Sequence, residues 1–104
     1  MDSYKIAILD GDGIGPEIMY EATKILDLVA ERNQVNFELL AAPFGASAYF
    51  SHGHSFPKES KDICDQADAI LKGPIGLSHE ESKKIPVDMQ PERGALLPLR
   101  RRYN

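Results

Sequence analysis

Two short segments of the chain contain residue types that could bind or transform a small molecule. The first is the glycine-rich stretch Gly11-Asp12-Gly13-Ile14-Gly15-Pro16-Glu17, which follows an apolar run and leads into a helical pattern. Free amide groups at a helix N-terminus bind anions, so the stretch predicts either an anion site or a tight turn that packs a helix closely on a strand. The Rossmann fingerprint G-x-G-x-x-G requires glycine at position 16, where this chain has proline, so the usual pyrophosphate turn is absent.

The second segment places leucines and an arginine on a helical pattern. It reads Gln90-Pro91-Glu92-Arg93-Gly94-Ala95-Leu96-Leu97-Pro98-Leu99-Arg100. A guanidinium is a permanently charged, bidentate donor suited to carboxylates, while leucines suit either a helix core or the alkyl group of a ligand. The run 100–102 also allows a nucleic-acid patch, but three arginines without interleaved aromatic residues are a weak footprint. We therefore expect no nucleic-acid partner.

Other polar residues favour structural roles. His52, His54 and His79 could suggest zinc, but no cysteine or carboxylate stands at a familiar ligand spacing. Cys64 has no neighbouring base that would mark it as a nucleophile, and we expect it on a helix surface or partly in the core. Asp10 and Asp12 are more typical of turn and cap formation than of acid–base catalysis.

Composition indicates an ordinary globular chain of about one small domain. The 104 residues carry a formal net charge of −4 and are 42% apolar. No apolar run approaches the roughly 18 residues that span a bilayer, and no export signal is recognisable, so we expect no membrane partner. A single cysteine cannot form an internal disulfide, which favours a reducing, cytoplasmic location.

The elements that must position these residues follow an alternating pattern. A strand over 5–9, apolar enough to be buried on both faces, precedes a helix over 15–32, and a second strand covers 37–42. Strand, helix and strand in this order predict a right-handed crossover in a parallel sheet, and so an α/β fold. Further elements are a loop over 43–57 with a helical turn at 46–50, a helix over 58–66, a strand over 69–71, a polar connection over 78–91 and a last helix. The first helix is expected to pack through Ile18, Ala22, Ile25 and Val29.

Three motifs in this order resemble the β-decarboxylating dehydrogenases, the isocitrate/isopropylmalate dehydrogenase family. The string Gly-Asp-Gly-Ile-Gly-Pro-Glu after the first strand resembles the opening of these enzymes. The stretch Ala67-Asp68-Ala69-Ile70-Leu71-Lys72-Gly73-Pro74-Ile75-Gly76 is similar to the family's strand and glycine turn before its cofactor loop. The segment 90–100 resembles the isopropylmalate branch. The resemblance implies part of a parallel-sheet domain of the isopropylmalate dehydrogenase-like fold.

The resemblance also implies site residues. Arg100 matches an arginine that binds a substrate carboxylate, and Leu96 and Leu97 match the pair that lines the pocket for the isopropyl group of 3-isopropylmalate. Glu92 matches a glutamate near the nicotinamide ribose of NAD, Ile14 aligns near the adenine end, and Leu77 begins a cofactor-contacting loop. That loop departs from the common Gly-Gly-Pro-Lys-Trp, because this chain has Gly-Leu-Ser-His-Glu at 76–80.

The implied reaction is an NAD-dependent oxidation followed by loss of carbon dioxide, with Mg²⁺ or Mn²⁺, in leucine biosynthesis. No catalytic residue and no metal ligand of the family falls in this chain, so residues 1–104 are expected to form the N-terminal part of the first, larger domain of a homodimeric enzyme. Alone, they are expected to be inactive. The alternatives are a sister enzyme for tartrate, homoisocitrate or isocitrate, a non-enzymatic α/β module that binds anions, and a basic-tailed interaction protein.

Overall fold

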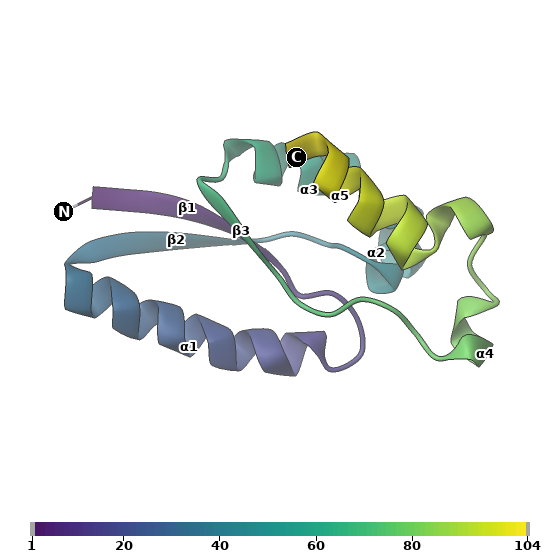
Figure 1. Cartoon of the computed structure of the whole chain (residues 1–104), viewed down its shortest axis with the longest axis horizontal. Coiled ribbons are helices and arrows are strands. Elements are labelled where there is room, and N and C mark those ends of the chain that lie inside the picture. The colour runs from purple at the N-terminus through teal and green to yellow at the C-terminus, as the bar shows by residue number, and fades with distance from the viewer. Residues whose placement is uncertain (1, 104) are drawn as a thin grey trace.

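Three parallel strands form the centre of the molecule. The computed structural model describes residues 2–103. Its strands are β1 (Asp2–Leu9), β2 (Val35–Ala41) and β3 (Ala69–Lys72), and their order in the sheet is β2-β1-β3 (Figure 1). β1 lies in the middle because its second half, residues 6–9, is apolar and buried on both faces. The predicted α/β class and parallel sheet are confirmed.

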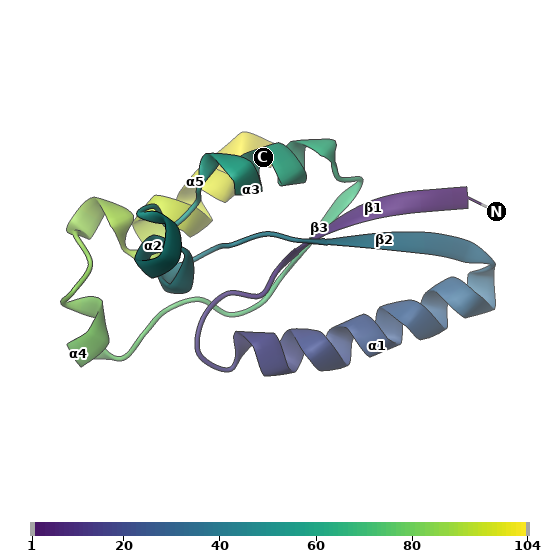
Figure 2. The ribbon, with the colours of Figure 1, turned by 180° about the vertical axis from the view of Figure 1, so that it is seen from behind.

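Helices cover both faces of this sheet. α1 connects β1 to β2 and covers one face, whereas α3 and α5 lie on the other, as the two opposite views agree (Figures 1 and 2). The sheet is thus the middle of three layers. The helical elements are α1 (Gly15–Asn33), α2 (Ala46–His52), α3 (Lys58–Gln66), α4 (His79–Ser82), a 3₁₀ turn (Val87–Met89), a π-helical segment (Pro91–Leu96) and α5 (Leu97–Tyr103).

Alternation along β1 divides the core into two clusters. Ile6 and Ile8 face α1 and contact the buried Met19. Ala7 and Leu9 face the opposite layer and join a larger cluster with Phe44, Phe56, Cys64, Ala95 and Leu99, among others. This larger cluster fixes the C-terminal helical segment, which carries Leu96 and Arg100, against the sheet.

The packing face predicted for α1 is wrong. Ile18, Ile25 and Val29 are exposed, and α1 contacts the sheet through Met19 and Leu26 instead. The helix carries two apolar stripes one residue apart, and the small sheet face formed by Ile6 and Ile8 accepts only one of them. Periodicity alone could not select between two such stripes.

The connection after β3 has more helical structure than predicted. α4 and the 3₁₀ turn occupy the stretch expected to be a polar connection. The C-terminal segment then begins as a π-helix and becomes α-helical near Pro98, which has no N–H to continue the earlier hydrogen-bond ladder. In residues 2–103, no helix is both long and apolar enough to cross a membrane.

Candidate functional site

The strand order reverses beside the glycine-rich turn. From β1 the chain moves to β2 on one side and then to β3 on the other, so the carboxyl ends of β1 and β3 flank a topological switch point. Ligands of open α/β sheets bind at such points. Gly11 has φ +80°, and a Cβ there would lie 2.0 Å from the Pro74 carbonyl oxygen, so only glycine fits where the two strand ends meet.

Asp12 ties this switch point together. Its amide donates to the Pro74 carbonyl at 2.8 Å. Its carboxylate, only 4% exposed, accepts hydrogen bonds from the amides of Ala46 (2.9 Å), Ser47 (2.8 Å) and Gly76 (2.9 Å). The carboxylate therefore caps the N-terminus of α2 and anchors the loop after β3, which agrees with the predicted role in turns and caps.

The N-terminus of α1 offers little to an anion. The Gly15 amide donates to the Asp12 carbonyl at 2.8 Å, and Pro16 has no N–H. Two of the first three amide positions are thus closed to a ligand. The interpretation of the glycine-rich stretch as a tight turn is the one that this geometry favours.

A surface hollow brings together residues of the two later motifs. It has a volume of about 520 Å³, and we call it the α5 hollow; its lining residues are Ile70, Lys72, Leu96, Leu99, Arg100 and Tyr103. Two cations thus stand beside an apolar lining. Such a surface suits a small organic acid with an alkyl group, because the apolar part gains by leaving water while the cations bind carboxylates.

Two of the three predicted substrate residues meet in this hollow. Leu96 and Arg100, one helical turn apart, both line it, whereas Leu97 is 43% exposed and is not among its lining residues. Lys72 was not predicted. Its signal in the sequence was its place as the last residue of a strand, since ligands gather at the carboxyl ends of parallel strands.

The predicted cofactor residues lie around the loop after β3. Glu92 approaches Gly76, because its Oε1 lies 3.7 Å from where a Cβ on that glycine would stand, and Leu77 follows directly. Ile14 is exposed at the start of α1, on the turn whose Asp12 holds the Gly76 amide. An exposed apolar side chain and a carboxylate suit the adenine and the ribose hydroxyls of a dinucleotide, respectively.

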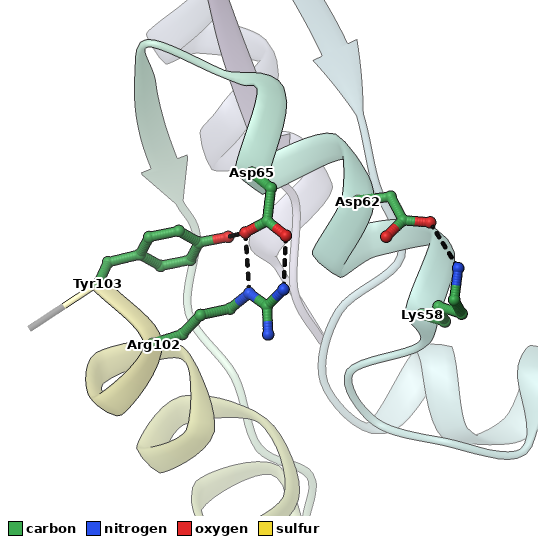
Figure 3. A network of polar contacts seen from close by, with 5 residues as sticks. All are labelled: Lys58, Asp62, Asp65, Arg102 and Tyr103. Atoms are coloured by element: carbon green, nitrogen blue, oxygen red, sulfur yellow. Dashed lines mark hydrogen bonds and ion pairs between the residues drawn. The ribbon is translucent and has the colours of Figure 1, made fainter.

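One polar cluster links the end of α5 to α3 (Figure 3). Arg102 donates from Nε to Asp65 Oδ1 at 2.8 Å and from Nη2 to Oδ2 at 2.5 Å, and the Tyr103 hydroxyl donates to Oδ1 at 2.5 Å. These hydrogen bonds hold the pKa of Asp65 well below its usual range. Burial, and then the bond to Asp65, raise the pKa of Tyr103 to about 12. We call Asp65, Arg102 and Tyr103 the Asp65 cluster.

The structure assigns no chemistry to the histidines or to Cys64. His52 Nε2 lies 2.9 Å from Glu59 Oε1, and His54 Nδ1 accepts from the Phe56 amide. Among residues 2–103, no three His, Cys, Asp or Glu side chains are grouped to hold a metal ion. Cys64 is buried, more fully than expected, and burial raises the pKa of its thiol, which disfavours the reactive thiolate.

Comparison with known proteins agrees with the motifs. The family model described as isocitrate/isopropylmalate dehydrogenase matches residues 5–104. The chain is similar to 3-isopropylmalate dehydrogenases: 46% identical to that of Salmonella paratyphi A over 97% of this chain and 27% of the relative. It is also 48% identical to that of Syntrophotalea carbinolica (94% and 26%) and 40% identical to that of Campylobacter jejuni (100% and 28%). The chain spans about a quarter of the length of these relatives. With the parallel sheet and the three motifs, these matches establish that the chain belongs to the isocitrate/isopropylmalate dehydrogenase family.

Proposed function

We propose that this chain forms the N-terminal part of the larger domain of an NAD-dependent dehydrogenase that oxidises and decarboxylates 3-isopropylmalate in leucine biosynthesis. The observation that carries the proposal is the α5 hollow, in which Leu96 and Arg100 stand together. The names of the relatives, all 3-isopropylmalate dehydrogenases, support the same substrate.

In this proposal the chain binds and orients the substrate. Arg100 would hold a carboxylate through two parallel hydrogen bonds, which fixes both the position and the plane of that group. Leu96 would pack against the isopropyl group and exclude water from it. Leu97 stays a predicted contact of the same alkyl group. Holding the substrate in one pose prepares its hydroxyl-bearing carbon for hydride loss.

The cofactor is proposed to lie along the loop after β3. Ile14, Leu77 and Glu92 would contact NAD, which accepts the hydride, while Asp12 keeps the loop at Gly76 in place. A divalent cation, Mg²⁺ or Mn²⁺, would supply Lewis-acid chemistry for the decarboxylation. Residues 2–103 contain no grouped ligand set for such a cation. A cytoplasmic homodimer belongs to the same proposal.

One observation favours a sister enzyme as the second candidate. Lys72 gives the α5 hollow a second cation beside Arg100. A substrate with an additional carboxylate, as in isocitrate or homoisocitrate, would use that charge, whereas Leu96 favours an alkyl group. The non-enzymatic anion-binding module lacks comparable support, because the α1 N-terminus has few free amides.

The test is steady-state kinetics on the natural gene product that carries this sequence. We expect kcat/KM for 3-isopropylmalate with NAD to exceed that for isocitrate, homoisocitrate and tartrate at least tenfold. Preference for isocitrate or homoisocitrate would establish the second candidate. If none of the four acids is oxidised, the proposal is wrong.

A matched pair of arginine variants tests the hollow itself. Arg100→Lys removes the bidentate fork and is expected to cost about 2–3 kcal/mol of transition-state stabilisation. This corresponds to a loss in kcat/KM of roughly 30- to 150-fold. Arg101→Lys is the control: Arg101 is exposed like Arg100 but does not line the hollow, and its replacement should change kcat/KM less than threefold. Equal effects of the two variants would contradict the assignment of Arg100.

A further inference from the structure

Tyr103 forms part of the wall of the α5 hollow and is held from outside it. Its side chain lines the hollow with Leu96 and Arg100, which precede it by seven and three residues and so share its side of the helix. Its hydroxyl donates to Asp65 on α3. The phenol oxygen is therefore hydrogen-bonded to α3, while the ring borders the space proposed for the substrate.

Asp65 fixes two consecutive side chains of the last turn of α5. The Arg102 guanidinium occupies both carboxylate oxygens, and Tyr103 adds a third donor to one of them (Figure 3). A bidentate pair with a third hydrogen bond restricts these two side chains far more than one point contact does.

We propose that Asp65 is a positioning residue that sets substrate size: by holding Tyr103, it limits the alkyl group that the α5 hollow accepts. The inference rests on the proposed function, since it assumes that the hollow receives the alkyl group of a substituted malate. Asp65 does not line the hollow and acts through the tyrosine.

α3 provides a matched control. Asp62, one turn before Asp65, also forms an exposed ion pair, with Lys58 Nζ at 3.1 Å from Oδ2 (Figure 3). The two aspartates have comparable side-chain exposure, 52% and 40%. Within residues 2–103, however, the Asp62 carboxylate accepts no hydrogen bond from α5. Replacing either aspartate by alanine removes the same kind of side chain from the same helix.

The experiment measures kcat/KM of the natural gene product for 3-isopropylmalate and for a 3-alkylmalate with a bulkier branched alkyl group. In a hydrophobic pocket, two substrates that differ by one methylene differ in kcat/KM by about 10- to 200-fold. We expect Asp65→Ala to lower the preference for the isopropyl compound by about 3- to 10-fold. Tyr103→Phe, which keeps the ring but loses the hydroxyl, should have the same effect. Asp62→Ala should change the preference less than twofold.

The outcomes separate this inference from the proposed function. The double variant of Asp65→Ala and Tyr103→Phe should lose no more preference than the larger single change, because both remove one contact. Equal loss of kcat/KM for both malates, with the preference kept, indicates a merely structural role and overturns the inference alone. Absence of turnover of any alkylmalate by the unsubstituted protein overturns the proposed function and this inference with it.

Discussion

Asp12 shows how a single buried carboxylate can join three segments. It accepts amide hydrogen bonds from the first two residues of α2 and from Gly76 after β3. A carboxylate is the natural partner for several converging N–H groups, because each of its oxygens can accept more than one bond. The residue therefore stabilises the switch point by joining three segments of the chain.

Removing this carboxylate is expected to be costly. Asp12→Ala leaves three amides without their acceptor and should lower the free energy of unfolding by about 3–5 kcal/mol. Asp10→Ala is the control, since the Asp10 side chain lies on the same turn and accepts no hydrogen bond within residues 2–103. Urea denaturation of the natural gene product measures both. Equal losses would show that the three bonds contribute little.

The Asp65 cluster predicts a pH dependence of stability. The pKa of Asp65 is lowered in the folded state from an ordinary value of 3.8. A lowered native pKa means that the stabilisation is fully present above the unfolded value and is lost as pH falls toward the native one. Asp65→Asn should therefore reduce Tm at pH 7, and its difference from the unsubstituted protein should shrink below about pH 4.

The neighbouring ion pair again supplies the control for this measurement. Asp62→Asn, which breaks an i, i+4 pair with Lys58, should change Tm by less than Asp65→Asn at pH 7, because isolated surface pairs contribute little. A Tm difference for Asp65→Asn that stays constant from pH 7 to pH 2.5 would contradict the lowered pKa.

At the scale of elements, the C-terminal motif depends on a close helix contact. A Cβ on Gly94 would lie 2.3 Å from Ser55 Oγ and 2.8 Å from the Asp88 carbonyl oxygen. Gly94→Ala should therefore lower the free energy of unfolding by about 1–3 kcal/mol, through displacement of the π-helical segment. Thermal or urea unfolding is the measurement.

A change at Ser55 shows how much of the stability lost in Gly94→Ala comes from the contact with the Ser55 hydroxyl. Its hydroxyl is buried and has no hydrogen-bond partner among the described residues, so Ser55→Ala alone should be nearly neutral. Combined with Gly94→Ala, Ser55→Ala removes the oxygen that the new methyl group would meet, so part of the lost stability should return. The recovery should be incomplete, because the backbone contact with Asp88 remains. No recovery would show that the Ser55 contact is not the limiting one.

Local patterns in the sequence predicted most elements, whereas choices made by tertiary packing were missed. The helix over 58–66 agrees with α3 residue for residue, and the strands differ by a few residues at their ends. The packing face of α1 was wrong, because two apolar stripes compete for one small sheet face. Arg100 and Leu96 were predicted from their motif, and both line the α5 hollow. Lys72 and the contact of Asp65 with Tyr103 required distant segments to be placed side by side.

At the scale of the whole molecule, apolar surface remains uncovered. Ile25 is 61% and Leu28 is 59% exposed on α1, and the strands β2 and β3 form the two edges of the sheet. Open sheet edges and contiguous apolar surface favour association. The described residues measure 46 × 25 × 22 Å, an elongated shape that buries less apolar surface than a compact one.

A polypeptide limited to these 104 residues is therefore expected to self-associate and to lack dehydrogenase activity. Sedimentation velocity should show species larger than the monomer, and the double change Ile25→Lys, Leu28→Lys on α1 should shift them toward the monomer. A monodisperse monomer that melts cooperatively would contradict this expectation. So would measurable oxidation of 3-isopropylmalate by the short polypeptide.

The bonds to Asp12 also order events during synthesis. They connect residues 34, 35 and 64 positions apart in the chain. At about 5–20 residues per second, a ribosome needs roughly 3–13 s to make the stretch from Asp12 to Gly76. Until these residues are made, the turn after the middle strand lacks its last amide donor, Gly76, and the strand itself lacks its β3 neighbour. Of the three strands β1 is made first, and its β3 side thus stays open until the later residues follow. A chaperone that binds nascent chains would find residues 2–12 accessible for several seconds.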